Sequence, residues 1–514
     1  MCIRDRYDLG KAPLSKWRNE PIGYRILTMG KALMIQGCGS NVGKSLLVAG
    51  LIRAAKKRGL RVAPFKPQNM SNNAAITVDG GEAGRAQSFQ AYAAGIDFHS
   101  DMNPVLLKPE SKIGSQIILN GKKYKSLKAR EYYSHKDKFI GIAIKSFKNL
   151  VNDYDLVIAE GAGSLAEVNL RKADIANMGF ASVLRVPVIV TADIERGGVI
   201  AQLIGTKEVL DQNDINLIEG FIINKFRGDK SLFDDGVAFI EKKTDWRCFG
   251  VMPFFDKAKL FPAEDSQDLK SSFGTGKCVI SVLKLSRIAN FDDFDPLKID
   301  NRLKLQFVEP GNPIPADTNL IIIPGTKSTI ADLKFLKCQG WDIDLKAHYR
   351  RGGFILGICG GYQILGNEII DDQGYDGTPS KAKGLGLLNV KTKMGKQKNL
   401  GKKDFISNIN GKKISGYEIH LGVTSGSDCN NPFATLRNKK DGAISSNGLV
   451  MGTYLHGLFF SDEFRNKFVA KLSSEEKKED VSFHDTIDLI LEEFVKVIED
   501  NLDVDSILSV ARNI

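Results

Sequence analysis

The sequence lacks the features that mark membrane-spanning, secreted and zinc-binding proteins. Its apolar runs, such as 320–323 and 186–191, have the length of a strand and not of a membrane span. The first residues, MCIRDRYDLGKAP, are charged and contain no apolar segment of a secretory signal. Seven cysteines are scattered along the chain and form no CxxC pair, so neither a zinc site nor a disulfide framework is indicated. We therefore expect a cytoplasmic protein without a membrane partner.

A nucleic-acid signature is also missing, although the formal net charge is +11. The lysines are dispersed, and no zinc finger, RNP-type aromatic motif or long basic run is found. The densest basic segment, 391–403, is interrupted by glycines, which is typical of a solvated loop. We expect no nucleic-acid partner, while the positive charge is compatible with attraction of a polyanionic substrate.

The pattern of apolar runs predicts an α/β protein of more than one domain. A chain of 514 residues is too long for a single hydrophobic core, so two to four domains are expected. From residue 30 to about 270, buried-type strands alternate with amphipathic helices, which indicates a parallel, doubly wound sheet. The strands are predicted at 32–36, 61–65, 155–159, 186–191 and 217–223, and helices at 44–58, 82–94 and 198–210.

A polar, breaker-rich segment at 261–276 predicts a linker between two domains. A second α/β series follows it, with strands predicted at 278–283, 320–323, 353–358 and 450–454 and a closing helix at about 486–499. The predicted organisation is therefore an extension (1–28) outside the fold, a first domain (29–272) and a second domain (273–514).

A glycine-rich loop, GCGSNVGKS (37–45), lies between the first predicted strand and helix. Backbone N–H groups and a helix N-terminus at such a place can bind phosphate. The loop is one residue longer than GxxxxGK[ST], and Cys38 occupies a position where glycine is expected, so a βα connection without a ligand is the alternative. In the phosphate interpretation, Lys44 reaches the β and γ phosphates and Ser45 ligates Mg²⁺. The phosphate-binding residues are then Gly37, Ser40, Gly43, Lys44 and Ser45.

Three charged residues at other predicted strand and helix ends could complete a phosphoryl-transfer site. Glu160 directly follows the strand 155–159 and is a candidate metal ligand, because the ends of parallel strands meet at one edge of the sheet. Glu82 opens the helix 82–94 and is a second candidate ligand, or simply a charge favourable to the helix dipole. Lys66 follows the strand 61–65 and could neutralise a transferred phosphoryl group, or be a solvated loop lysine.

The stretch GICGGYQ (357–363) places a cysteine between glycines on a tight strand-to-helix turn. This arrangement predicts a nucleophile, Cys359, whose thiolate is favoured by the helix N-terminus. The N–H of Gly360 and the loop at Gly325 are the predicted oxyanion donors. His456, after another strand, is the predicted general base, with His420 as the runner-up. A structural role is the alternative for a lone histidine.

Long stretches of the sequence resemble the cobyric acid synthase family, glutamine-dependent amidotransferases of cobalamin biosynthesis. The resemblance runs from about residue 30 to the end of the chain and leaves the extension outside it. It is carried by PFKPQNMSNNAAITVDGGEAGRAQ (64–87), DMNPVLLKP (101–109), EGAGSLAEVNLRKADIANMG (160–179), NKFRGD (224–229), RIANFDDFDPL (287–297), IPGTKSTIADL (323–333), GICGGYQILG (357–366), GYEIHLG (416–422) and YLHGLF (454–459).

The resemblance implies an ATP- and Mg²⁺-using domain similar to dethiobiotin synthetase, followed by a class I glutaminase domain. In such a glutaminase Cys359 and His456 would form the glutamyl thioester and release ammonia. Other triad glutaminases carry a glutamate two residues after the histidine, where this chain has Leu458. The cobyric acid branch similarly lacks that glutamate. The group that orients His456 is therefore not identified, and Glu418 is a candidate substitute.

The implied substrate is (adenosyl)cobyrinic acid a,c-diamide, amidated at side chains b, d, e and g, with cobalt arriving in the substrate and not as a protein cofactor. Glutamine and ATP are the other implied small-molecule partners. One alternative is cobyrinic acid a,c-diamide synthase, which uses the same chemistry on an earlier corrinoid. Another is a partitioning-type P-loop ATPase, stimulated by DNA, with an inactive glutaminase domain. The sequence does not indicate the oligomeric state.

Overall fold

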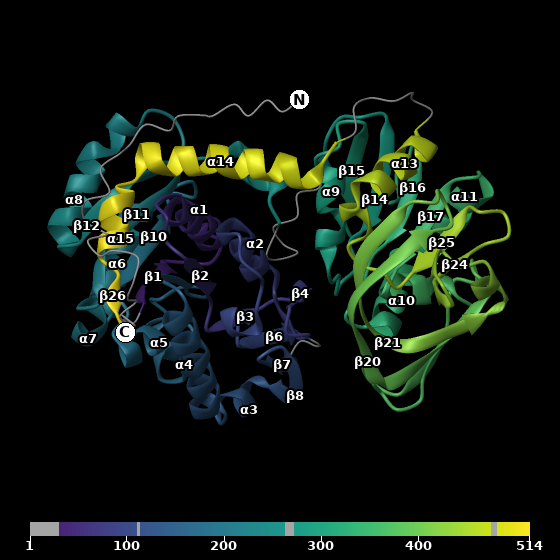
Figure 1. The fold of residues 1–514 in the computed structure, drawn as a ribbon, viewed down its shortest axis with the longest axis horizontal. Helices are drawn as coiled ribbons and strands as arrows, with labels where there is room; N and C mark the ends of the chain where they lie inside the picture. The colour runs from purple at the N-terminus through teal and green to yellow at the C-terminus, as the bar shows by residue number, and fades with distance from the viewer. Residues whose placement is uncertain (1–29, 110–113, 263–271, 474–480) are drawn as a thin grey trace, which may run out of the picture.

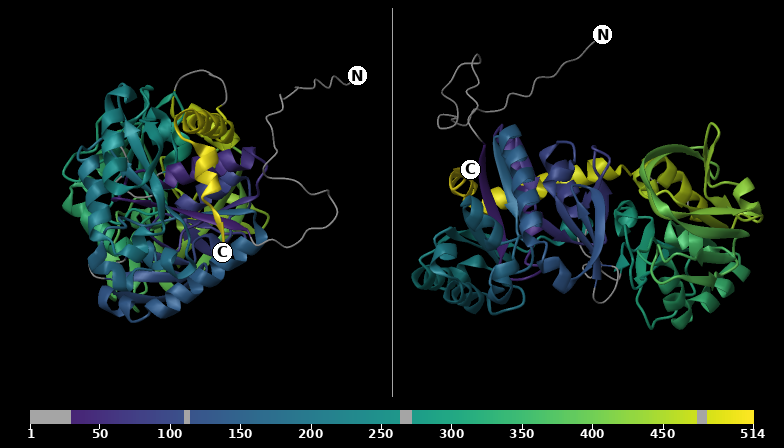
Figure 2. Two further views of the ribbon diagram at one scale, coloured as in Figure 1. Left: turned by 90° about the vertical axis from the view of Figure 1, so that its left-hand side faces the viewer. Right: turned by 90° about the horizontal axis from the view of Figure 1, so that it is seen from below.

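The computed structural model describes residues 30–109, 114–262, 272–473 and 481–514. The extension 1–28 and most of the predicted linker lie outside the described residues. The described chain forms two α/β units that lie side by side, and Figure 2 shows the same arrangement from two further directions (Figures 1 and 2).

The first unit is built on a parallel sheet, as predicted. Its strand order is β12-β11-β10-β1-β9-β2: the chain passes from β1 to the edge strand β2, returns to β9 beside β1, and continues through β10 and β11 to β12 on the other side. The strands are β1 (Lys31–Gly37), β2 (Val62–Phe65), β9 (Leu156–Glu160), β10 (Val188–Asp193), β11 (Ile218–Phe226) and β12 (Arg247–Pro253). The helices are α1 (Lys44–Lys57), α2 (Arg85–Ala94), α3 (Ala129–Tyr133), α4 (Lys136–Asp153), α5 (Met178–Leu184), α6 (Val199–Val209), α7 (Gln212–Ile215) and α8 (Asp234–Thr244).

Both faces of this sheet are buried against helices. Successive side chains of each strand point to opposite faces, so each strand contributes to both. In β1, Leu33 and Ile35 pack in one hydrophobic cluster with α1, whereas Ala32 and Met34 pack in another with α4, α5 and α6. This explains why the strands are apolar along their whole length and do not alternate with polar residues.

The end of the chain packs on the first unit, although the sequence assigned it to the second. Helix α14 (Phe483–Asn501) runs from the second unit across the first (Figure 1), followed by α15 (Val504–Ser509) and β26 (Arg512–Asn513). Strand β26 pairs antiparallel with the beginning of β1. The buried stripe of α14, which includes Leu491 and Ile498, shares a hydrophobic cluster with α1. Residues 483–514 therefore complete the first unit.

Two smaller sheets extend the first unit toward the second. One has the order β3-β6-β7-β8, and the other is the hairpin β4-β5. Their strands are β3 (Gln68–Met70), β4 (Ala74–Ile76), β5 (Glu82–Gly84), β6 (Val105–Pro109), β7 (Gly114–Leu119) and β8 (Lys122–Lys128). Glu82 thus belongs to a strand, and the helix predicted over 82–94 begins at Arg85.

The second unit is a further α/β sheet, again as predicted, with the order β13-β15-β14-β16-β17-β25-β24. The five central strands are parallel, and each edge strand is antiparallel to its neighbour. The strands are β13 (Ser272–Phe273), β14 (Cys278–Leu283), β15 (Leu303–Val308), β16 (Leu320–Ile323), β17 (Phe354–Ile358), β24 (Ala443–Ile444) and β25 (Val450–Thr453). The helices are α9 (Asp295–Lys298), α10 (Thr329–Cys338), α11 (Trp341–Arg350), α12 (Gly360–Leu365) and α13 (Asp462–Leu472).

A long antiparallel hairpin, β20 (Val390–Ser407) and β21 (Lys413–Gly426), belongs to a further sheet of this unit. The other strands of that sheet are β18 (Glu368–Asp371), β19 (Ser380–Lys383), β22 (Ala434–Leu436) and β23 (Lys439–Asp441). The segment 391–403, predicted as a loop, lies within β20. Thr392 and Met394 are buried while Lys391 and Lys393 are exposed, so the lysines that suggested a loop occupy the solvent face of a strand.

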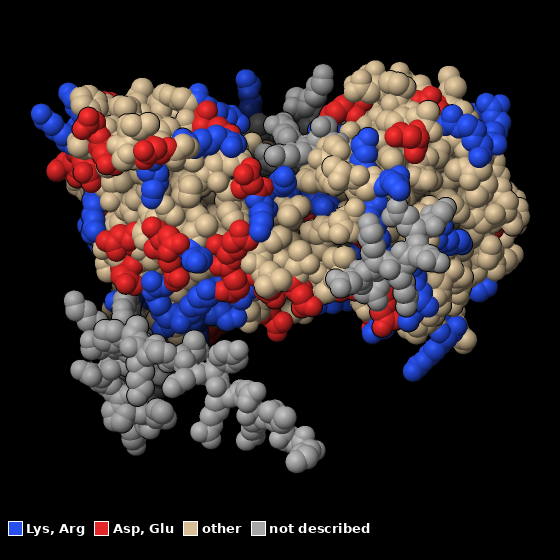
Figure 3. Space-filling model, turned by 90° about the horizontal axis from the view of Figure 1, so that it is seen from above, with Lys and Arg blue, Asp and Glu red and all other residues tan. Residues whose placement is uncertain are grey.

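The surface carries charges of both signs. Over the face seen from above, basic and acidic side chains are interspersed (Figure 3). Within the described residues, none of the helices combines the length and the apolar composition that a bilayer crossing requires.

Candidate active sites

The phosphate loop lies between β1 and α1, beginning at Gly37, the last residue of β1. Lys44 Nζ donates to the carbonyl oxygens of Gly39, at 3.0 Å, and of Gly163, at 2.9 Å. The lysine therefore joins the loop to the segment that follows β9. A cavity of about 490 Å³ opens over the loop, and its lining includes Ser40, Gly43, Lys44, Ser45, Lys66 and Glu160.

Glu160 is the polar centre of this cavity and is fully buried. Its Oε1 atom accepts from Ser45 Oγ at 2.6 Å and from Lys66 Nζ at 3.0 Å. Its Oε2 atom accepts from Gln90 Nε2, on α2, at 2.7 Å. The structure thus brings Ser45, Lys66 and Glu160 together, as their places at neighbouring strand ends suggested. Lys66 is only 3% exposed, which excludes a solvated loop lysine.

Glu82 lies elsewhere. Its carboxylate forms a buried ion pair, 2.7 Å long, with Nζ of Lys108, which lies on β6. The described residues that line the phosphate cavity do not include it. Glu82 is the first residue of the hairpin strand β5 and does not open a helix. The geometry gives no support to Glu82 as a ligand of a metal held at Glu160.

Cys359 occupies a strained turn between β17 and α12. Its φ is +53° and its ψ is −108°, a conformation that residues with a side chain rarely adopt. The close packing of the turn explains the glycine at 361, where a Cβ atom would lie 1.9 Å from the carbonyl oxygen of Ile323. The strand–cysteine–helix geometry predicted from the sequence is therefore present.

His456 follows β25 and faces the same cavity as Cys359. Its backbone is fixed by two hydrogen bonds with Tyr417, of 2.8 and 3.0 Å, and the two rings stack at 5.3 Å. Burial opposes a charge on the ring, but the carboxylate of Asp293 and the nearby Cys359 raise the pKa of His456 well above its ordinary value. The structure therefore favours an imidazolium beside the cysteine.

Asp293 is the residue that orients His456. Its Oδ2 atom lies 2.8 Å from His456 Nδ1, and its Oδ1 atom accepts from the Gly457 N–H at 2.6 Å. Asp293 is fully buried in a short 3₁₀ helix (Phe291–Phe294) after β14. Glu418, the candidate substitute, instead lies 3.6 Å from Lys403 Nζ.

The sequence contained a signal for Asp293 that could not be resolved to one residue. It lies in the run NFDDFD, within a stretch that carried the family resemblance, together with two further acids, Asp292 and Asp295. No local spacing relates this run to His456, since the two are 163 positions apart. Their meeting is a consequence of strand order in the second unit.

The predicted oxyanion residues lie beside the thiol. Gly360 is the first residue of α12, and Gly325 lines the same cavity as Cys359. A Cβ atom at Gly325 would lie 2.8 Å from His456 Cε1, so only glycine leaves the imidazole room there. His420 also lines this cavity, but it stacks on Tyr454 at 3.7 Å, and burial lowers its pKa to about 4. That environment suits a packing role better than a base.

The sheet β3-β6-β7-β8 of the first unit closes the cavity around Cys359. Lys108, Gln116 and Lys123 contribute to its lining from that sheet. Lys327, beside the oxyanion loop, donates to Gln116 Oε1 at 3.1 Å. Arg85, the first residue of α2, forms an ion pair of 3.3 Å with the fully buried Asp292. The two units therefore meet at the cavity that contains Cys359.

Comparison with known proteins identifies both units. Residues 33–267 match the CobQ/CobB/MinD/ParA nucleotide binding domain, and residues 279–464 match the CobB/CobQ-like glutamine amidotransferase domain. A cobyric acid synthase from Bradyrhizobium diazoefficiens is 56% identical over 94% of this chain and 100% of its own length. The chain belongs to the cobyric acid synthase family. Relatives of that name from Cereibacter sphaeroides and Rhodobacter capsulatus are each 53% identical over 94% of this chain and 100% of their own.

Membership of the cobyric acid synthase family accounts for the pair of sites. The nucleotide-binding match covers the phosphate loop and Glu160, and the amidotransferase match covers Asp293, Cys359 and His456. The C-terminal segment 483–514 lies beyond both matched ranges, yet it packs on the nucleotide-binding unit.

Proposed function

We propose that the chain amidates carboxylates b, d, e and g of (adenosyl)cobyrinic acid a,c-diamide to give cobyric acid, using ATP and glutamine. Family membership supports an ATP- and glutamine-dependent amide-forming enzyme of cobalamin synthesis. The observation that carries the proposal is the presence of two built sites in one chain: a phosphate loop over buried Glu160, and Cys359 beside a His456–Asp293 pair. Neither site alone makes an amide from glutamine and a carboxylate.

In the glutaminase half, the Cys359 sulfur attacks the side-chain amide carbon of glutamine. The carbonyl oxygen becomes an oxyanion next to the N–H of Gly360 and the loop at Gly325. His456 gives its proton to the departing nitrogen, so ammonia leaves and a glutamyl thioester remains. His456 then takes a proton from water, which attacks the thioester and releases glutamate and the thiol. Asp293 holds the ring by Nδ1 throughout, leaving Nε2 to serve the reaction.

In the synthetase half, a substrate carboxylate attacks the γ-phosphorus of ATP, and ADP departs. The product is an acyl phosphate, whose carbonyl carbon then accepts ammonia as phosphate leaves, with loss of one proton to water. This activation is needed because ammonia does not displace oxide from a carboxylate. Lys44 and the backbone of the phosphate loop bind the phosphates, and Lys66 offsets the charge that develops on the transferred group.

Mg²⁺ fits the donor set of this site. Ser45 Oγ and the Glu160 carboxylate are hard oxygen donors placed 2.6 Å apart at the phosphate loop. Mg²⁺ commonly takes one or two carboxylates and completes its shell with phosphate and water oxygens. When bound, the ion neutralises negative charge on the phosphates. We assign Ser45 and Glu160 as the residues that hold it.

The experiment is mass spectrometry of cobyrinic acid a,c-diamide after incubation with the protein, glutamine, ATP and Mg²⁺. We expect four successive exchanges of OH for NH₂, ending at cobyric acid, and no exchange without ATP. If cobyrinic acid gains two amides while the a,c-diamide stays unchanged, the chain is a cobyrinic acid a,c-diamide synthase instead. ATP hydrolysis stimulated by DNA, with no change to either corrinoid, would support the partitioning-type alternative.

A further inference from the structure

Strands β6 and β7 separate two cavities. In their antiparallel pairing Lys108 lies opposite Gln116, and Leu107 lies opposite Ile117. Lys108 and Gln116 line the cavity that contains Cys359, whereas Leu107 and Ile117 line a second cavity. Because successive side chains of a strand point to opposite faces, the two cavities lie on opposite sides of the same pair of strands.

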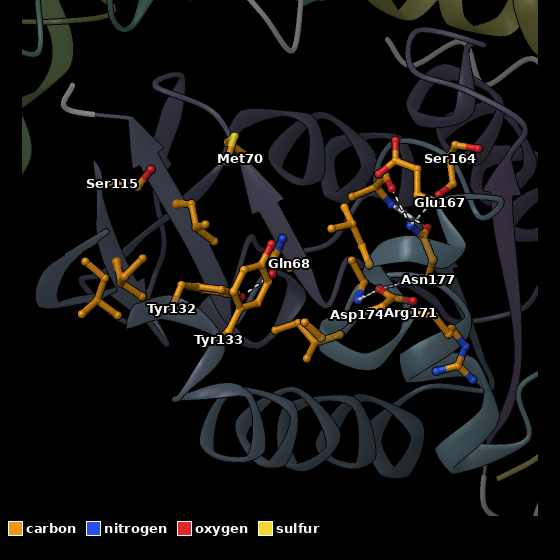
Figure 4. A pocket seen from close by; sticks show the side chains of 18 of the residues that line it. Gln68, Met70, Ser115, Tyr132, Tyr133, Ser164, Glu167, Arg171, Asp174 and Asn177 are labelled. Atoms are coloured by element: carbon orange, nitrogen blue, oxygen red, sulfur yellow. Dashed lines mark hydrogen bonds between the residues drawn. The ribbon is translucent and has the colours of Figure 1, made fainter. Parts of the chain in front are cut away.

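The second cavity has a volume of about 490 Å³, within the range of small-molecule sites. Its walls come from two parts of the first unit (Figure 4). Gln68, Ser115, Tyr132 and Tyr133 lie on one side, and Tyr132 donates its hydroxyl proton to Gln68. The other side is the segment from the end of β9 to α5, which contributes the apolar residues Leu165, Leu170 and Ile175. Strands β6, β7 and β8 add Leu107, Ile117 and Leu127 to the lining.

This cavity also adjoins the phosphate cavity. Met70 and Ala162 line both. Ala162 precedes Gly163, whose carbonyl oxygen accepts from Lys44, so the shared wall lies at the phosphate end of the nucleotide site. Asn177 fixes that wall, because its Nδ2 donates to the Ala162 carbonyl at 2.6 Å and its Oδ1 accepts from the Ala162 N–H at 3.0 Å.

We propose that this cavity binds the edge of the corrinoid that carries the reacting carboxylate. The inference rests on the proposed function. An acyl phosphate forms only where a carboxylate reaches the terminal phosphate, and it becomes an amide only where ammonia arrives. The cavity borders the phosphate site through Ala162 and lies across β6 and β7 from Cys359. Its apolar walls suit the macrocycle, and its amide and hydroxyl groups suit the side chains.

The charged residues among the described lining of the cavity are Arg171 and two acids, Glu167 and Asp174, and Asp174 accepts from the backbone N–H groups of Ala176, Asn177 and Gly179. Among its described lining residues Arg171 is the only lysine or arginine, and its guanidinium is paired with Asp214 through bonds of 2.7 and 2.8 Å. A free guanidinium clamp would favour the carboxylate over the amide that replaces it. Gln68 and the tyrosine hydroxyls can donate or accept, so they tolerate both forms as successive side chains are presented.

A rival cavity of about 450 Å³ lies between α2, β21 and α14. It meets the phosphate cavity at Phe89 and Pro262, and neither Lys44 nor the Gly163 segment that binds it lines the rival cavity. A carboxylate held there would be placed at a different part of the nucleotide site. Ser88 lines this rival cavity and provides a matched control for Ser115, since both are half-buried serines.

The test is equilibrium dialysis of cobyrinic acid a,c-diamide against the full chain without ATP. Ser115→Trp fills the proposed cavity, and we expect it to weaken corrinoid affinity at least about tenfold. Tyr133→Ala removes an exposed ring from the cavity wall with little risk to folding, and we expect a loss of about three- to tenfold. Ser88→Trp should leave the affinity unchanged. Thermal unfolding and ATP affinity check that each variant is folded.

The outcomes separate the inference from the function on which it rests. Loss of corrinoid binding in Ser88→Trp but not in Ser115→Trp or Tyr133→Ala overturns the inference in favour of the rival cavity. Binding by the unmodified chain that no variant changes also overturns it. If the unmodified chain neither binds nor amidates the corrinoid, the proposed function fails, and the inference fails with it.

Discussion

Asp293 determines which ring nitrogen of His456 faces the thiol. By accepting from Nδ1 at 2.8 Å, it fixes the ring orientation and stabilises the imidazolium against the cost of burial. Its second oxygen is engaged by the Gly457 N–H, so the carboxylate itself is held in place. The residue therefore has the geometry of the third member of a catalytic triad, although it stands far from His456 in the sequence.

Asp293→Asn should lower the glutaminase kcat by about 10²- to 10⁴-fold, because the ring loses its orientation and its counter-charge. Burial then dominates, and the pKa of His456 falls. Since the raised pKa keeps the ring protonated to higher pH, its loss should move the alkaline limb of the kcat profile to lower pH. Steady-state glutaminase assays over a pH series and an NMR titration of the ring measure both effects.

Glu418→Gln is the matched control, since Glu418 was the acid suggested by the sequence and lies by Lys403 instead. We expect it to change kcat by less than about threefold, the effect of a partly exposed ion pair. A large loss in Glu418→Gln with little loss in Asp293→Asn would assign the orienting role to Glu418 and contradict the geometry described above.

Some of the site residues could be located from the sequence and others could not. Ser45 and Glu160 each follow a recognisable apolar strand, and the rule that parallel strands end at one edge brings them together. Asp293 has no such marker, because it lies in a short 3₁₀ helix among other acids. Asp293 meets His456 only because β14, β17 and β25 pack in one sheet.

Helix α14 is an element that could likewise be predicted only in part from the sequence. Its existence follows from its amphipathic pattern, but the pattern cannot tell which unit the apolar stripe covers. In the structure Leu491 is fully buried and Leu489 is 72% exposed, so the stripe faces α1 and the solvent face lies opposite. Salt bridges of α14 with Arg53 and Lys57 on α1 lie along the edge of this contact.

Two other elements differ from expectation for related reasons. Glu82 lies in the hairpin β4-β5, where pairing with β4 overrides a helix-like composition. The segment 391–403 forms a strand because β21 satisfies its backbone groups, whereas its lysines alone suggested a solvated loop. In contrast, β14 and β16 have the predicted bounds, since a fully buried parallel strand leaves an uninterrupted apolar run.

Leu491→Ala should destabilise the nucleotide-binding unit by about 2–5 kcal/mol through loss of buried surface and the cavity left behind. The matched variant Leu489→Ala, on the opposite face of the same helix, should change stability by less than about 0.5 kcal/mol. Urea denaturation, followed by the binding of a fluorescent ATP analogue, measures the difference. Equal effects of the two substitutions would show that α14 does not pack on this unit.

At the scale of the molecule, the two units place the proposed site of ammonia release beside the proposed site of carboxylate activation. The first unit contributes the phosphate loop, and its small sheet also closes the cavity around Cys359 in the second unit. Helix α2 spans the same region, since Gln90 contacts Glu160 and Arg85 contacts Asp292, the neighbour of Asp293. The two proposed reaction sites therefore lie on the two sides of one interface.

The central claim is that these are two separate sites, one supplying nitrogen and one priming a carboxylate. The most direct measurement compares corrinoid amidation by Cys359→Ala with glutamine and with ammonium as the nitrogen source. We expect synthesis with glutamine to fall by more than about 10³-fold, because no thioester forms, and synthesis with ammonium and ATP to remain near that of the unmodified chain. Unchanged synthesis with glutamine, or equal loss with both nitrogen sources, would contradict the account.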